Sequence, residues 1–153
     1  MKLIYIAGPY RQWYDSVGEA NTIAHNIMDA RGVSAELVRR LNEKGIFPVT
    51  PHLNTARFER LEGLDVVPDH YWLQGTLELM RRCDGVLLTR PDADRISGGT
   101  RNELHVAEKM GLPIYRTLDE LCSCVLESAS LDPSVPLEHV LVPNFPHTRS
   151  GRR

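Results

Sequence analysis

The sequence predicts an α/β domain in which a parallel sheet of about four or five strands carries helices on both faces. Short runs rich in Ile, Val and Leu alternate along the chain with longer segments of helical periodicity, the order expected of βαβ units. These runs also lack the apolar and polar alternation of half-exposed strands. We therefore expect them to be buried on both faces, as the strands of parallel sheets are.

The length and composition fit one globular domain. With 153 residues, of which 42% are hydrophobic and 25% charged, the chain is long enough to bury a core without disulfides or metal ions. A net charge of -2 disfavours a nucleic-acid-binding surface spread over the protein. We find no signal peptide or membrane span, and Cys83, Cys122 and Cys124 lack metal-site spacing. We expect reduced thiols, no metal site and a cytoplasmic protein.

Residues 3–7 are the first predicted strand, and they suit the centre of the sheet. Gly8 and Pro9 then make a tight turn at the carboxyl edge, where open α/β sheets bind ligands. Tyr10 and Arg11 project from that edge. For Tyr10, position alone leaves two interpretations, an aromatic that covers the sheet end or a contact with the ligand.

A long helix and the second strand follow. Residues 11–29 have no convincing apolar period and are predicted to be a loop with a partial helix. An apolar stripe from Val33 to Leu41 predicts the helix, which ends at Gly45. Ile46–Val49 is the next predicted strand, and the proline inside it indicates an irregular or edge strand.

The middle of the chain returns to the same sheet edge. His52 lies just past the second strand, where a lone histidine is more often a hydrogen-bonded structural residue than a catalyst. Residues 54–68 are polar and are predicted to be a surface loop or lid. Residues 69–82 predict a helix with basic residues at its end. Asp84 then caps or fixes the turn into the strand Gly85–Leu88.

The last elements complete the alternation. A polar loop is predicted at residues 90–95, and residues 113–115 are the fourth strand. A capping box at Thr117 opens the final helix. Residues 131–153 contain repeated prolines and are predicted to be an arm, partly ordered or in contact with an oligomer partner. The predicted domain is thus residues 1–130, a Rossmann-like or flavodoxin-like sheet with right-handed crossovers.

Residues 97–103 carry the clearest functional signal. Ser97 is placed to cap a helix, and two glycines after it leave backbone amides uncovered, which favours an anion at the helix N-terminus. Glu103 shares a helix face with Val106 and Ala107, the face that should pack against the sheet. A carboxylate there costs stability and therefore indicates chemistry. The alternative interpretation is a turn that merely closes onto a helix.

In this order, these motifs resemble the nucleoside 2-deoxyribosyltransferase-like superfamily, including its deoxynucleoside 5'-monophosphate N-glycosidase branch. The resemblance covers about residues 2–121. It rests on the Ile-Ala-Gly-Pro-Tyr run ending at Tyr10, Pro-His-Leu at 51–53, Tyr-Trp-Leu at 71–73, Cys-Asp at 83–84, and Ser-Gly-Gly-Thr at 97–100 followed by Glu103.

The resemblance implies hydrolysis or transfer at the N-glycosidic bond of a nucleoside 5'-monophosphate. In such proteins a glutamate at the position of Glu103 attacks the anomeric carbon, and Tyr10 lies near the sugar. The predicted catalytic residues are therefore Glu103 and Tyr10. The helix N-terminus beside apolar neighbours is expected to keep Glu103 ionised yet poorly solvated. Ser97, where the transferases commonly carry aspartate, favours a phosphate because a carboxylate would repel it. The predicted substrate- and phosphate-binding residues are Gly8, Pro9, Arg11, His52, Ser97, Gly98, Gly99 and Thr100.

The resemblance also bears on partners. It implies a small nucleotide or nucleoside as ligand, with no nucleic acid polymer, no membrane and no cofactor. It further implies a homodimer or higher homo-oligomer in which a neighbour helps to close each site. Asn144 and His147 of the C-terminal arm are candidates for that contribution, and a disordered tail is the alternative.

Thr76 departs from the family pattern, which usually has an aspartate eight residues before Asp84. Threonine is no general acid near neutral pH, so either Asp69, Glu78 or His52 supplies the proton or the protein binds nucleotides with little turnover. Glu78 is disfavoured because it lies on nearly the opposite helix face from position 76. Two other enzyme classes are less favoured as alternatives. Phosphoribohydrolases have a longer Gly-Gly-x-Gly-Thr loop than this chain, and dinucleotide enzymes have a Gly-x-Gly-x-x-Gly motif that is missing here.

Overall fold

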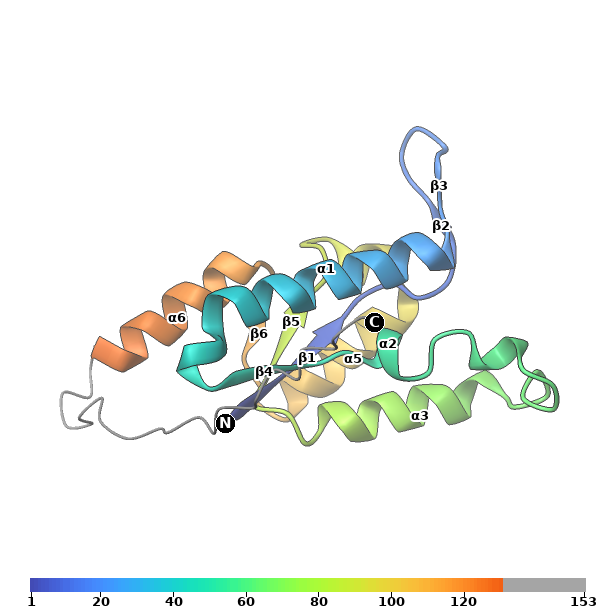
Figure 1. Cartoon of the computed structure of the whole chain (residues 1–153). Helices are drawn as coiled ribbons and strands as arrows, with labels where there is room; N and C mark the ends of the chain where they lie inside the picture. The colour runs from blue at the N-terminus through green and yellow to red at the C-terminus, as the bar shows by residue number, and fades with distance from the viewer. Residues whose placement is uncertain (131–153) are drawn as a thin grey trace, which may run out of the picture.

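The computed structural model describes residues 1–130 (Figure 1). Its main sheet has four parallel strands in the order β4-β1-β5-β6. The prediction of an α/β protein with a parallel sheet is confirmed, and this small sheet is consistent with a Rossmann-like arrangement. The strands are β1 (Lys2–Ala7), β4 (Ile46–Val49), β5 (Gly85–Leu88) and β6 (Ile114–Tyr115).

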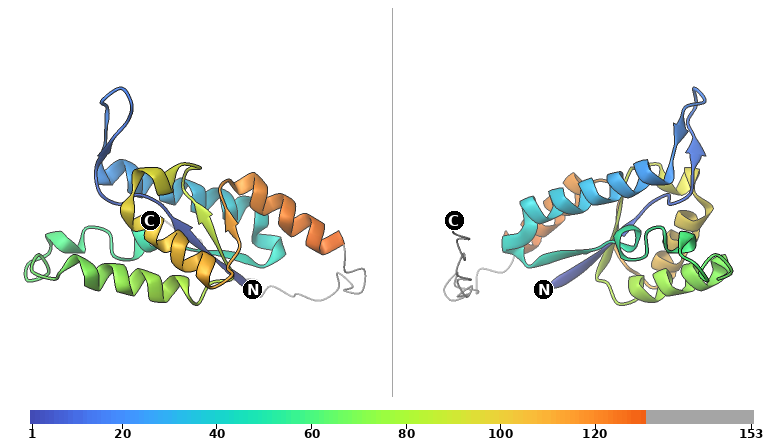
Figure 2. Two further views of the ribbon diagram at one scale, coloured as in Figure 1. Left: turned by 180° about the vertical axis from the view of Figure 1, so that it is seen from behind. Right: turned by 45° about the vertical axis from the view of Figure 1, so that its right-hand side comes forward.

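Helices cover both faces of the sheet because its inner strands are apolar on both sides. In β1, Ile4 and Ile6 pack on the face covered by α1 and α6, whereas Tyr5 and Ala7 pack on the face covered by α3 and α5. Figure 2 shows this layering from two further directions. The four helices are α1 (Ile23–Leu41), α3 (Asp69–Met80), α5 (Gly98–Lys109) and α6 (Leu118–Ser130).

Residues 11–29, predicted as a loop with a partial helix, contain more regular structure than expected. The first part is an antiparallel hairpin of β2 (Trp13–Tyr14) and β3 (Ala20–Asn21), which projects from the body (Figure 1). The long helix α1 begins well before the predicted stripe. Thr22 caps it by accepting from the His25 amide at 3.3 Å, and His25 accepts in return from the Thr22 amide at 3.4 Å. A histidine in the place of the usual Glu or Gln concealed this capping box.

The helix α3 is less buried than its apolar residues suggest. Tyr71 and Leu73 are 60% and 46% exposed, and Met80 is the one buried residue of this helix. Residues 54–68, predicted as a loop or lid, form turns and a short helix, η2 (Phe58–Arg60). The predicted loop at 90–95 instead contains a helical turn, α4 (Ala93–Ile96), because Ala93 is buried against the sheet.

Several local predictions are confirmed. β4 is an edge strand, as its proline indicated. The Asp84 carboxylate accepts from the Leu3 amide at 2.7 Å and so fixes the start of β5 to β1. Thr117 accepts from the Glu120 amide at 3.2 Å, and Glu120 accepts in return from the Thr117 amide at 3.3 Å. Between residues 1 and 130 no helix has the length and apolarity needed to cross a membrane. The predicted arm at 131–153 lies outside the described residues.

Candidate functional site

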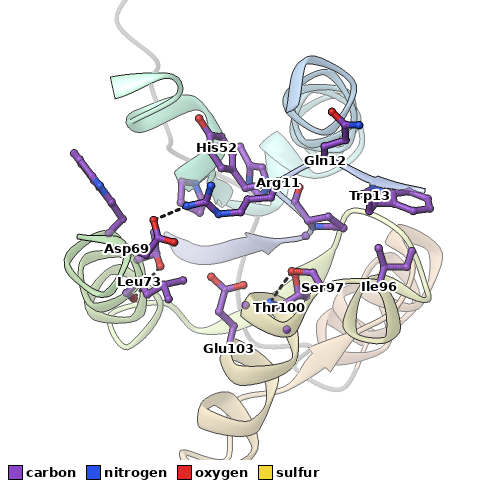
Figure 3. A pocket seen from close by; sticks show the side chains of 18 of the residues that line it. Arg11, Gln12, Trp13, His52, Asp69, Leu73, Ile96, Ser97, Thr100 and Glu103 are labelled. Carbon is purple, nitrogen blue, oxygen red and sulfur yellow. Dashed lines mark hydrogen bonds and ion pairs between the residues drawn. The ribbon is translucent and has the colours of Figure 1, made fainter. Parts of the chain in front are cut away.

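A cavity of about 400 Å³ lies at the carboxyl edge of the sheet. The turn after β1, the short helix α2 (Pro51–Asn54), the helix α3 and the N-terminal half of α5 form its walls (Figure 3). Its volume is in the range of small-molecule sites. Every predicted site residue lines it, namely Gly8, Pro9, Tyr10, Arg11, His52, Ser97, Gly98, Gly99, Thr100 and Glu103.

Glu103 is a buried carboxyl in the wall of this cavity. It lies in the second turn of α5, and only 9% of its surface is exposed. The predicted packing of its helix face is confirmed, because Ala107, one turn further on, is completely buried against the sheet. Its Oε1 accepts a hydrogen bond from the Tyr5 hydroxyl at 2.6 Å.

The ionisation of Glu103 differs from the expectation drawn from the sequence. Burial raises the pKa of Glu103 to about 7, and the hydrogen bond from Tyr5 opposes that rise. The helix N-terminus was expected to keep this carboxyl ionised, but the loss of hydration is the stronger effect. Near neutral pH the group is therefore divided between its protonated and ionised forms, a range that suits catalytic acids, bases and nucleophiles.

Tyr5 is a site residue that the sequence analysis missed. It lies in β1, is completely buried and points to the same side of the sheet as α5. Burial and the neighbouring Glu103 raise the pKa of Tyr5 well above its usual value. The phenol thus stays a neutral donor. In the sequence it is one apolar residue of a buried strand, and only strand direction and helix packing bring it to Glu103.

Residues 97–100, which we call the anion-binding end, surround the N-terminus of α5. Ser97 caps the helix as predicted, its Oγ accepting from the Thr100 amide at 3.2 Å. Around Gly98 no atom lies within 4 Å of the place that a Cβ would take, so its backbone borders open space. The Thr100 Oγ1 is buried and has no hydrogen-bond partner within residues 1–130. Amides, the helix dipole and a free hydroxyl therefore meet at one end of the cavity.

The turn after β1 is held in place by tight packing. At Gly8 a Cβ would lie 2.1 Å from the Thr89 Oγ1, so only glycine fits there. His52 donates from Nε2 to the Pro9 carbonyl at 3.0 Å, which supports its structural interpretation. Burial lowers the pKa of His52, so the ring is neutral, and its buried Nδ1 has no partner among the described residues. With the proton on Nε2, Nδ1 is an acceptor.

Tyr10 lies in the cavity wall, with its hydroxyl held by the 54–68 segment. It donates to Glu59 at 3.1 Å and accepts from the Arg57 amide at 2.8 Å. Its ring meets His52 edge-on, with ring centroids 6.0 Å apart. In this conformation the hydroxyl is engaged away from Glu103, so Tyr10 shapes the wall, and its predicted catalytic role stays a prediction.

Comparison with protein families assigns most of the chain. Residues 2–117 match the model of a domain of unknown function, DUF7768. The chain belongs to this family. The match includes all four strands of the main sheet and every cavity residue named above. No curated protein and no solved structure matches the chain.

Another side of the DUF7768 cavity, which we call the α3 end, is formed by Arg11, Asp69, Trp72 and Thr76. Leu73 reaches from α3 toward residues 97–100, with its Cδ2 3.8 Å from the place that a Cβ on Gly99 would take. Arg11 and Asp69 form an ion pair there, and Glu103 lies between this pair and the anion-binding end (Figure 3). Arg11, predicted among the substrate- and phosphate-binding residues, thus lies away from Ser97.

Thr76 and Glu78, the two α3 residues weighed in the search for a proton donor, differ in their relation to the DUF7768 cavity. Thr76 lines it and donates to the Leu73 carbonyl at 3.0 Å. Glu78 does not line it and instead pairs with Arg81 and Arg82. Within residues 1–130 no group of three or more His, Cys, Asp and Glu side chains is arranged to hold a metal ion. The cavity therefore presents a helix N-terminus, a buried carboxyl and an exposed charged pair, in that order.

Proposed function

We propose that this chain cleaves the N-glycosidic bond of a nucleoside 5'-monophosphate, with Glu103 as nucleophile, by hydrolysis or by transfer to another base. The observation that carries the proposal is the buried Glu103 carboxyl. A carboxyl that serves only the fold is normally paired with a cation when buried. Burial raises the pKa of Glu103, the hydrogen bond from Tyr5 opposes that rise, and no cation of residues 1–130 shifts it. The carboxyl also faces a cavity.

The position of Glu103 supports this role because Glu103 lies between the two ends of the cavity (Figure 3). A phosphate at the anion-binding end would accept hydrogen bonds from the amides of Gly98 and Gly99 and from the buried Thr100 hydroxyl. The sugar would then lie over Glu103, and the base would extend toward the α3 end. The order of the sheet, β4-β1-β5-β6, corresponds to the first strands of a flavodoxin-like sheet, in which ligands bind at this edge.

The proposed reaction has two steps. The ionised Glu103 attacks the anomeric carbon, an ester bond forms, the carbon–nitrogen bond breaks, and the base leaves with the electron pair and takes up a proton. Tyr5 holds Oε1, which leaves Oε2 for the sugar. Water, or the nitrogen of another base, then attacks the same carbon and releases Glu103 as a carboxylate.

A second candidate function is a domain that binds the nucleotide with little turnover. The observation that favours it is the placement of the three residues considered as proton donors to the leaving base. Glu78 lies outside the cavity, the His52 Nε2 proton is engaged by Pro9, and Asp69 is paired with Arg11. Thr76 lines the cavity, but its hydroxyl is too weak an acid to protonate a leaving base near neutral pH.

Release of free base distinguishes the two functions. The full chain is incubated with 2'-deoxyribo- and ribonucleoside 5'-monophosphates, and the base is measured by chromatography. We expect release that falls at least about a thousandfold in Glu103→Gln and is unchanged in Glu108→Gln, an exposed glutamate of the same helix. If no base is released although a nucleotide raises the melting temperature, the second function holds. Equal release by Glu103→Gln and wild type would contradict the assignment of Glu103.

A further inference from the structure

The α3 end of the cavity presents a guanidinium and a carboxylate side by side. Arg11 comes from the turn after β1 and Asp69 from the first turn of α3, and their side chains point toward each other (Figure 3). The bond between them uses Nη2 of the arginine and Oδ1 of the aspartate. The remaining guanidinium N–H groups and the other carboxylate oxygen are left for a ligand.

This pair is poorly suited to stabilising the fold. Both side chains are about seven-tenths exposed (70% and 69%), and exposed ion pairs contribute little to stability. Arg116 provides the contrast, because it donates to both Asp94 carboxylate oxygens and to the Pro91 carbonyl and so fixes a loop. Arg11 and Asp69 share one contact and line the cavity. A ligand could therefore replace that contact at low cost.

The same end of the cavity offers a wall for a flat ring. Trp72 lines it, and the Trp72 ring meets Phe58 and Tyr71 edge-on, with centroids 6.4 and 5.2 Å away. These contacts hold the indole in one orientation. A planar base lying along this wall would turn its polar edge toward Arg11 and Asp69.

We propose that Arg11 and Asp69 recognise guanine, so that the substrate is a guanine nucleoside 5'-monophosphate. The inference rests on the proposed function, which places the base at the α3 end. Guanine carries two adjacent acceptors, O6 and N7, which match a guanidinium, and beside them two adjacent donors, N1–H and the 2-amino group, which match a carboxylate. Adenine lacks the paired donors, and pyrimidines lack N7. Every other base leaves one of the two charged groups partly unsatisfied, which lowers affinity.

Equilibrium binding tests this inference without relying on turnover. The full chain carrying Glu103→Gln is titrated by calorimetry with the 5'-monophosphates of deoxyguanosine, deoxyinosine and deoxyadenosine. Deoxyinosine monophosphate differs from the guanine nucleotide by the 2-amino group alone. We expect the guanine nucleotide to bind about tenfold more tightly than either of the others. Adding Asp69→Asn should reduce the guanine-to-hypoxanthine ratio to near one, because an amide cannot accept from both donors.

A matched control uses an exposed ion pair elsewhere. Glu36→Gln removes the partner of Arg39 on α1 and should leave the ratio at about ten. Retained binding of deoxyadenosine monophosphate by Asp69→Asn shows that its cavity is intact. Equal affinities for the three nucleotides, or an unchanged ratio in Asp69→Asn, would overturn guanine recognition.

The outcomes separate this inference from the proposed function. Guanine-selective binding by a chain that releases no base supports the inference and contradicts cleavage. Base release from all nucleotides with equal kcat/KM supports cleavage and overturns guanine recognition. If none of the nucleotides binds, both are overturned.

Discussion

The two ends of the cavity are built in opposite ways. At the anion-binding end, Ser97 caps a helix, Thr100 is buried and Glu103 next to them is held by a core tyrosine. At the α3 end, the side chains of Arg11 and Asp69 are exposed, and Asp69 lies on a helix with Met80 as its one buried residue. Buried groups with fixed partners favour chemistry that needs exact placement, whereas exposed pairs suit recognition that changes partners. Substitutions should therefore change the stability of the fold strongly at the anion-binding end and weakly at the α3 end.

The largest effect on stability is expected at Glu103. Its pKa of about 7 in the folded protein lies above its ordinary value of 4.5, so folding binds a proton more tightly and stability falls as the pH rises between these values. Glu103→Gln has no such loss. At pH 8 it should raise the free energy of unfolding by about 3 kcal/mol, and at pH 4 by little. Urea unfolding at the two pH values measures this, with Glu108→Gln as an unchanged control. Equal stability of wild type and Glu103→Gln at pH 8 would show that burial does not penalise the charge.

A smaller effect is expected when the Tyr5 hydroxyl is removed. The hydrogen bond from Tyr5 stabilises the ionised carboxylate, so its loss moves the pKa of Glu103 further above 7. In Tyr5→Phe the rising limb of the pH–rate profile should shift to higher pH, and kcat/KM at pH 7 should fall about tenfold. Tyr115→Phe, whose hydroxyl contacts Cys124 outside the cavity, is the control. A lower rate with an unmoved limb would mean that Tyr5 acts on packing alone.

Removing the Thr100 hydroxyl should raise the stability of the fold and lower its affinity for a monophosphate. Its buried Oγ1 has no partner within residues 1–130, and an unpaired buried hydroxyl is unfavourable. Thr100→Val should therefore raise the free energy of unfolding by up to about 1 kcal/mol and weaken binding of a monophosphate several-fold. Binding of the matching nucleoside, which has no phosphate, should not change. If nucleoside and monophosphate lose affinity equally, Thr100 does not contact the phosphate.

The smallest effect on stability is expected at the α3 end. Because the Arg11–Asp69 pair is exposed, Asp69→Asn should change the free energy of unfolding by less than about 0.5 kcal/mol. Thermal or urea unfolding checks this directly. A loss of 2 kcal/mol or more would place the pair in the fold rather than in recognition, and the two ends of the cavity would no longer differ.

The sequence predicted the elements whose signals are local. The four strands are short apolar runs, and the helix after Thr117 has a standard capping box, so both could be found from neighbouring residues. The early start of α1 was missed because Thr22 is paired with His25, which gives no recognisable signal. The hairpin was missed because each of its strands has two residues, too few for an alternating pattern. The exposure of Tyr71 was missed because periodicity identifies an apolar face but not what covers it.

The same distinction between local sequence signals and long-range packing applies to the site. Residues 97–103 were predicted to form a helix N-terminus with a buried acid because that depends on spacing along one helix. The contact between Tyr5 and Glu103 joins residues far apart in the chain, so no local pattern contains it. The pKa of Glu103 also required the structure, since burial and dipole act in opposite directions and only their relative size decides. The implied homo-oligomer and the part played by residues 131–153 stay predictions.

The central claim is that Glu103 becomes bonded to the sugar. Rapid acid quenching of the full chain with a guanine nucleoside 5'-monophosphate, followed by peptide mass spectrometry, tests it most directly. We predict that the peptide containing Glu103 gains the mass of a sugar phosphate less one water, together with release of one equivalent of base, and that Glu103→Gln gains nothing. Base release with no adduct on this peptide at any quench time, or an adduct on another residue, would contradict the claim.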